Sequence, residues 1–144
     1  MMKLVMALSC ALMLVGCGSS QTEHEKIVKE LYSIIQKGED RAAQEKFWEE
    51  NVSRQFQDVC ARRSEKINSM EFKKAFGTIA KSKDPLTLKV IKSFEDDGVV
   101  MASAIEAQCA GTTLYFIVGK EEKDRQDQIL GITSNKDMAL AGGQ

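Results

Sequence analysis

Cysteine and histidine are the residues through which this 144-residue chain could perform covalent or metal chemistry. Its four cysteines are Cys10, Cys17, Cys60 and Cys109, and its one histidine is His24. A thiol can be acylated, oxidised to a disulfide or bound to a metal, but no two of these cysteines have the C-x-x-C spacing of redox and zinc motifs. We therefore expect neither a metal site nor another cofactor.

Hydrolytic chemistry has little support in the sequence. His24 lies between Glu23 and Glu25, ahead of the first apolar-periodic segment, and is expected to be exposed in the first helical turn. Ser53 and Ser64 lack the context of a nucleophile elbow. A triad built on His24 is therefore not expected, and no catalytic residue is assigned.

The strongest chemical signal surrounds Cys17. Met1–Lys3 carries one positive charge, and Leu4–Val15 is almost entirely apolar. This run of about twelve residues matches the hydrophobic region of a signal peptide and is too short to cross a bilayer core of about 30 Å. Leu14-Val15-Gly16-Cys17 resembles the lipobox of bacterial lipoprotein signals at all four positions.

The resemblance implies that residues 1–16 are a lipoprotein signal peptide and that Cys17 becomes the lipidated first residue of the mature chain. The protein would then be attached to the bacterial cell envelope through this lipid. Gly18 replaces the Asp that commonly retains lipoproteins at the inner membrane, so in a Gram-negative cell the outer membrane, facing the periplasm, is favoured. An ordinary secretory signal and a buried N-terminal helix are the alternatives.

Cys60 and Cys109 are the two cysteines left once Cys10 is removed and Cys17 is acylated. An exported protein tolerates disulfides, and an even pair favours a bridge. Closing a loop of about 50 residues would stabilise the fold by roughly 4 kcal/mol in the chain-entropy model. Two separate buried thiols are the alternative.

Composition limits the partners. The chain has 28% charged residues and a formal net charge of −1, with no basic patch of the kind that binds nucleic acid. Membrane contact would therefore come through the lipid on Cys17. The remaining partner would be an envelope protein or a small apolar ligand.

Periodicity predicts one α+β domain over residues 23–137, after a polar tether at residues 17–22. Ile27, Val28, Leu31, Ile34 and Ile35 form one face of a first helix that ends at Gly38. A second helical segment covers residues 39 to about 66, with a possible interruption at Asn51. A third helix begins near Asn68 and ends before Pro85.

After Pro85 the apolar period changes to two, which predicts strands. The expected strands are residues 86–94, 99–108, 112–119 and 128–134, joined by turns at Asp97-Gly98 and Ala110-Gly111 and by a charged loop at Lys120–Asp127. Residues 138–144 are expected to be a disordered tail. The predicted architecture is three N-terminal helices packed on a four-stranded antiparallel meander.

Ile27-Val28-Lys29-Glu30-Leu31-Tyr32, leading to Lys37-Gly38-Glu39-Asp40, resembles the first helix and turn of nuclear transport factor 2-like domains. The resemblance implies a sheet curved into a cone that can hold a ligand; the alternative is a plain four-stranded sheet over helices. The candidate pocket residues are Tyr32, Glu106, Tyr115 and Phe116.

We expect a non-enzymatic lipoprotein that binds its partner through the sheet face. One alternative is an inhibitor, immunity or exclusion lipoprotein that acts through the Lys120–Asp127 loop. The other is a small pocket enzyme that uses a carboxylate and a tyrosine for proton transfer.

The disulfide can be tested directly. Exported protein, alkylated and weighed intact with and without reductant, is expected to expose Cys60 and Cys109 to alkylation only after reduction. Two thiols that alkylate freely without reductant would refute the bridge.

Overall fold

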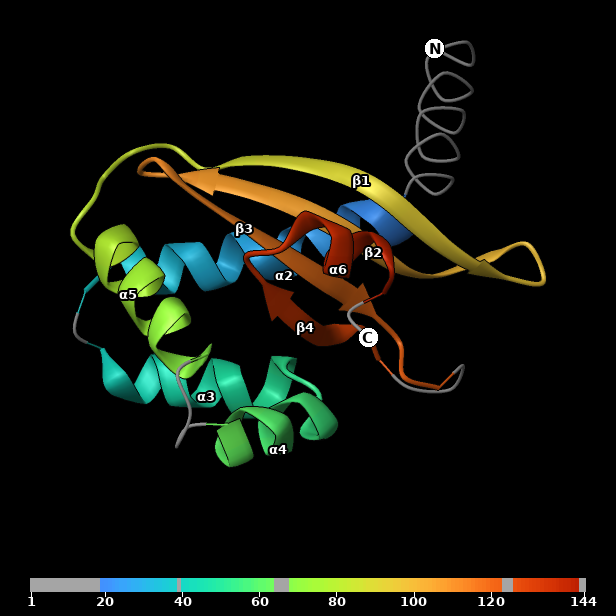
Figure 1. Ribbon diagram of the computed structural model, residues 1–144, viewed down its shortest axis with the longest axis horizontal. Coiled ribbons are helices and arrows are strands. Elements are labelled where there is room, and N and C mark those ends of the chain that lie inside the picture. The colour runs from blue at the N-terminus through green and yellow to red at the C-terminus, as the bar shows by residue number, and fades with distance from the viewer. Residues whose placement is uncertain (1–18, 39, 64–67, 123–125, 143–144) are drawn as a thin grey trace, which may run out of the picture.

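The computed structural model describes residues 19–38, 40–63, 68–122 and 126–142 (Figure 1). In chain order, its elements are α2 (Ser19–Gln36), α3 (Arg41–Asn51), α4 (Arg54–Arg63), α5 (Asn68–Ala80), β1 (Thr87–Asp96), β2 (Val99–Cys109), β3 (Thr112–Gly119), β4 (Gln128–Thr133) and α6 (Lys136–Leu140). The α+β prediction is confirmed: helices pack on a four-stranded antiparallel meander.

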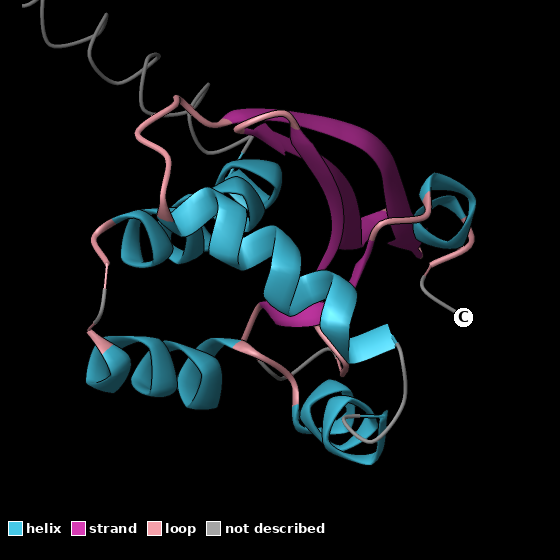
Figure 2. Cartoon of the chain, turned by 60° about the vertical axis from the view of Figure 1, so that its left-hand side comes forward, coloured by secondary structure: helices cyan, strands magenta, loops and turns pink. Residues whose placement is uncertain are grey.

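The sheet has the strand order β1-β2-β3-β4, as expected for strands joined by hairpins. Positive φ angles at Asp97, Gly98, Ala110 and Gly111 form the two tight turns. The helix beside the C-terminus, α6, lies on the opposite side of the sheet from the larger group of helices (Figure 2). The sheet therefore has two covered faces and two apolar clusters.

The main core lies between the sheet and α2. Its buried members are Val28, Leu31, Tyr32, Ile35, Phe47, Val52, Ile79, Ile105, Ala107, Cys109, Leu114, Phe116, Val118, Ile129 and Ile132. The second cluster, on the α6 side, contains Ala102, Ala104, Tyr115, Ile117 and Ala139. Along β3 the residues alternate between the two clusters, with Leu114, Phe116 and Val118 in the main core and Tyr115 and Ile117 in the second.

The apolar face of α2 explains its place at the centre of the core. Val28, Leu31, Tyr32 and Ile35 are at most 6% exposed and recur at helical spacing. Gly38 follows the helix with φ +95°. The N-terminal boundary differs from the prediction, because the described helix already begins at Ser19 and the expected polar tether at residues 17–22 is helical from that residue.

The second helical segment is divided in two, so four described helices precede the sheet rather than three. Val52 forms an isolated bridge with Ile129, and the Ser53 amide donates to the Ile129 carbonyl at 2.9 Å. The Ser53 hydroxyl then accepts from the Phe56 amide at 3.2 Å and caps α4. The junction covers part of the β4 edge, which explains the interruption expected at Asn51.

The predicted disordered tail is wrong for residues 138–140, which belong to α6. The Asn135 side chain accepts from the amides of Asp137 and Met138, at 2.9 and 3.3 Å, and caps this short helix. Ala139 is fully buried against the sheet. A five-residue helix is too short for its periodicity to be recognised in the sequence.

Gly119 and Gly77 provide a matched test of the packing. A Cβ at Gly119 would lie 2.6 Å from the Ala102 Cβ and would also clash with the Met101 carbonyl, whereas a Cβ at Gly77 meets nothing within 4 Å. Gly119→Ala should lower the free energy of unfolding by about 3 kcal/mol. Gly77→Ala should raise it by about 0.5–1 kcal/mol, because alanine favours the helix. Denaturant unfolding measures both; equal effects would contradict the described packing.

Candidate functional site

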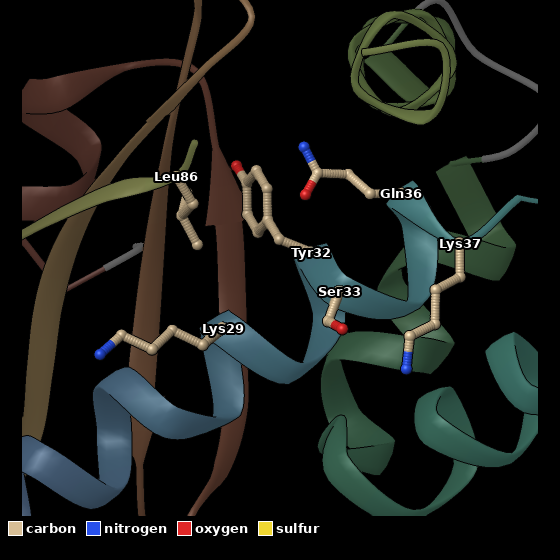
Figure 3. Close-up of a pocket in the computed structure, with 6 residues that line it drawn as sticks. All are labelled: Lys29, Tyr32, Ser33, Gln36, Lys37 and Leu86. Carbon is tan, nitrogen blue, oxygen red and sulfur yellow. The ribbon is translucent and has the colours of Figure 1, made fainter. Parts of the chain in front are cut away.

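A groove lies along the C-terminal half of α2, beside the segment that leads into β1. It has a volume of about 410 Å³ and is open to solvent. Its lining residues are Lys29, Tyr32, Ser33, Gln36, Lys37 and Leu86. Figure 3 shows the Tyr32 ring between Leu86 and Gln36, with Lys29 and Lys37 toward the two ends of the row on α2.

Tyr32 forms the floor of this groove. The side chain is 1% exposed, and its ring packs edge-on against Phe116 with centroids 5.8 Å apart. Its buried hydroxyl has no hydrogen-bond partner among the described residues. Burial, followed by the nearby Cys109, raises the pKa of the Tyr32 hydroxyl well above its usual value. The hydroxyl is therefore a neutral donor that lacks an acceptor.

Gln36 connects the groove to the segment before β1. Its Nε2 donates to the Asp84 carbonyl at 2.9 Å and lies 3.3 Å from the Cys109 sulfur. Burial and the Asp84 carboxylate raise the pKa of the Cys109 thiol. A thiol that is kept protonated is a poor nucleophile, so Cys109 is suited to packing rather than to covalent catalysis.

The four predicted pocket residues form two separate pairs, and only Tyr32 lines the groove. Tyr32 and Phe116 lie in contact on the helical face. Glu106 and Tyr115 are directly opposite each other in the β2–β3 ladder, and Tyr115 belongs to the cluster on the α6 side. The groove is therefore formed by α2 and Leu86 rather than by the sheet face that the sequence suggested.

A second groove, of about 370 Å³, lies where α3 and α4 meet. It is lined by Gln44, Glu45, Trp48, Glu49 and Gln57. The Gln57 amide donates to the carbonyls of Trp48 and Val52, at 3.0 and 2.8 Å. These bonds hold the helix junction together, so the Gln57 amide hydrogens are used within the protein and are not offered to a ligand.

His24 is the clearest disagreement with the sequence. It was expected to be exposed, but it is 1% exposed and bonded through both ring nitrogens. Nδ1 lies 2.8 Å from the Ser103 hydroxyl on β2, and Nε2 lies 3.0 Å from Asp127 Oδ1, just before β4. With the proton on Nε2, the ring donates to Asp127 and accepts the Ser103 hydroxyl hydrogen.

This Ser–His–Asp series has the residue types of a hydrolase triad but lacks a usable nucleophile. Ser103 is 0% exposed, whereas catalysis requires a hydroxyl that reaches its substrate. Neither groove is lined by His24, Ser103 or Asp127. Their hydrogen bonds instead connect the beginning of α2 to β2 and to the loop before β4.

The position of His24 could have been inferred from its spacing. It precedes Val28 by four residues, which places it on the same helical stripe as the apolar residues. Its polarity and the glutamates on both sides pointed to solvent instead. The sequence predicts a charged loop that ends at Asp127 and gives Ser103 no distinguishing context, because their contact with His24 depends on strand pairing.

Cys60 and Cys109 are not joined by a disulfide in this structure. Cys109 closes β2, whereas Cys60 lies on α4, and Figure 1 places α4 well away from that end of β2. A disulfide requires Cα atoms within about 7 Å of each other. The two cysteines are unbridged here, and the bridge stays a prediction that alkylation of the exported protein tests. The motif ending at Cys17 lies outside the described residues.

Within the described ranges, no group of three or more His, Cys, Asp or Glu side chains is placed to hold a metal ion. Comparisons with protein-family models, with curated proteins and with solved structures give no match to this chain.

Substitution at His24 tests the buried hydrogen bonds. His24→Ala should lower the free energy of unfolding by about 2–4 kcal/mol, because it leaves a cavity and an unpaired Ser103 hydroxyl. Asp127→Asn retains an acceptor for Nε2 at a partly exposed position and should cost about 1 kcal/mol or less. A His24→Ala variant as stable as the parent in urea would show that the ring is not held as described.

Proposed function

We propose that this chain is a membrane-anchored envelope lipoprotein whose α+β domain is a non-enzymatic binding module for a small ligand or a protein partner. The observation that carries the proposal is Leu14-Val15-Gly16-Cys17, placed directly after the apolar run. These residues resemble a lipobox in type and in position. The implied address is the cell envelope, and in a Gram-negative cell the periplasmic side of the outer membrane.

Acyl chains on Cys17 would be sufficient to hold the domain at the membrane surface. Each buried CH₂ contributes about 0.8 kcal/mol, so one acyl chain binds reversibly and two or more anchor a protein stably. Only Gly18 separates Cys17 from the start of α2 at Ser19. Two residues span about 7 Å at most, so the domain would lie close to the bilayer. No described helix is long and apolar enough to cross a membrane.

The binding role is supported by the groove along α2. Its volume of about 410 Å³ falls within the usual range for small-molecule sites, about 300–1,000 Å³. A catalytic role has less support, because the buried Ser103 hydroxyl cannot meet a substrate and the Cys109 thiol is held protonated. We therefore favour binding over an enzymatic activity.

Cys17→Ser tests the anchor. The variant should lose acyl labelling and move from the membrane fraction to the soluble fraction, because the serine hydroxyl does not receive the thioether-linked lipid. Cys60→Ser is the matched control and should remain in the membrane fraction. Unchanged fractionation of Cys17→Ser would contradict the proposal.

A further inference from the structure

We propose that the groove formed by Lys29, Tyr32, Ser33, Gln36, Lys37 and Leu86 binds a soluble organic monoanion, a carboxylate carried on a compact apolar body. This inference deepens the proposed binding function by naming the class of ligand. It is carried by two lysines beside an apolar floor and by a buried tyrosine hydroxyl without a partner.

The floor sets the apolar part of the ligand. The Tyr32 ring and the half-buried Leu86 side chain lie side by side (Figure 3), next to the aliphatic part of Gln36. Small ligands gain most of their affinity by covering apolar surface; here that surface is Leu86, and the Tyr32 ring, 1% exposed, becomes available when Leu86 turns aside. A body of about ten non-hydrogen atoms fits a groove of this volume and has an expected Kd of about 1 mM or somewhat lower.

The rim sets the charge of the ligand. Lys29 and Lys37 are exposed, and no lining residue carries a carboxylate. Asp84 lies just beyond Gln36, and its negative charge acts on Cys109 beneath the groove. The two lysines place positive charge at both ends of the groove, which favours an anion over a neutral ligand.

The Tyr32 hydroxyl sets the polar contact. A buried donor without an acceptor costs free energy, so a bound carboxylate oxygen gains by meeting it. The hydroxyl has almost no accessible surface, so ligand entry requires Leu86 to turn aside. Leu86 precedes β1 and is half-buried against the main core, so the ligand replaces part of the packing that this side chain gives up.

The position along α2 favours a soluble ligand over a lipid headgroup. Lys29 follows Ser19 by ten residues, which corresponds to about 15 Å along the helix axis. The lipid on Cys17 would lie at the other end of that helix. The groove is therefore at the end of α2 remote from the proposed anchor.

The test uses the full chain in nanodiscs of phosphatidylcholine, with binding followed by NMR chemical shifts. Hydrocinnamate is the probe, and the neutral hydrocinnamamide is its matched control. Hydrocinnamate should shift resonances of Tyr32, Gln36 and Leu86. The amide should bind about tenfold more weakly, because it lacks the charge that the lysines attract.

Three variants assign the contacts. Lys29→Gln combined with Lys37→Gln should weaken hydrocinnamate binding about fivefold or more, whereas Lys46→Gln on α3 should leave it unchanged. Tyr32→Phe should weaken binding and yet raise the Tm of the free protein, because it removes an unpaired buried hydroxyl. A lower Tm would show that the hydroxyl already has a partner and would overturn its assigned role.

Equal affinity for hydrocinnamate and its amide, or shifts that miss this groove, would overturn the proposal. Nanodiscs containing phosphatidylglycerol distinguish the source of the anion: if they alone shift the same resonances, the occupant is a lipid headgroup and not a soluble monoanion. Failure of any of these tests would not contradict the proposed lipid anchor, because fractionation of Cys17→Ser tests that anchor independently.

Discussion

The packing of α2 against β2 and β3 is the contact on which the rest of the domain depends. Val28 on this helix is fully buried, and Phe116 on β3 meets Tyr32 edge to face. Each fully buried side chain of this kind contributes roughly 1.5–3 kcal/mol through burial. Two further segments, the approach to β1 and the approach to β4, are bonded to the same helix through Gln36 and His24.

The two buried polar side chains on α2 have opposite situations. His24 satisfies both ring nitrogens and fastens the helix near its beginning. Tyr32, two turns further along, has a buried hydroxyl without a partner among the described residues. A satisfied buried group supports a fold, whereas an unsatisfied one is a reason to look for a ligand or a bound water. The helix therefore divides into a structural part near the proposed anchor and a proposed binding part at its other end.

Local sequence rules account for most of the sheet. Thr112–Gly119 alternates between two apolar faces, and Asp97-Gly98 and Ala110-Gly111 supply the positive φ angles that tight turns require. Both features act over a few residues, so they can be recognised without knowledge of the tertiary fold. The same logic applies where α2 ends at Gln36, shortly before Gly38 with its positive φ, and where the Asp40 side chain accepts from the Ala43 amide to cap α3.

The candidate site was only partly foreseeable, because it depends on contacts between distant segments. Tyr32 could be named as a pocket candidate from the sequence, but its neighbour Leu86 reaches the groove from the segment between α5 and β1. Glu106 and Tyr115 were placed with it, although strand register puts them on the other face. The apolar residues of the stripe begin at Ile27, and His24, one turn earlier, lies between two glutamates, so the sequence does not mark it as buried.

Amide hydrogen exchange of the full chain in nanodiscs tests the central role of α2 most directly. If α2 is the helix on which the domain is assembled, its amides from Val28 to Ile35 should exchange as slowly as those of β2 and β3, through global unfolding. Exchange of these amides through local opening, much faster than that of β2 and β3, would contradict the account.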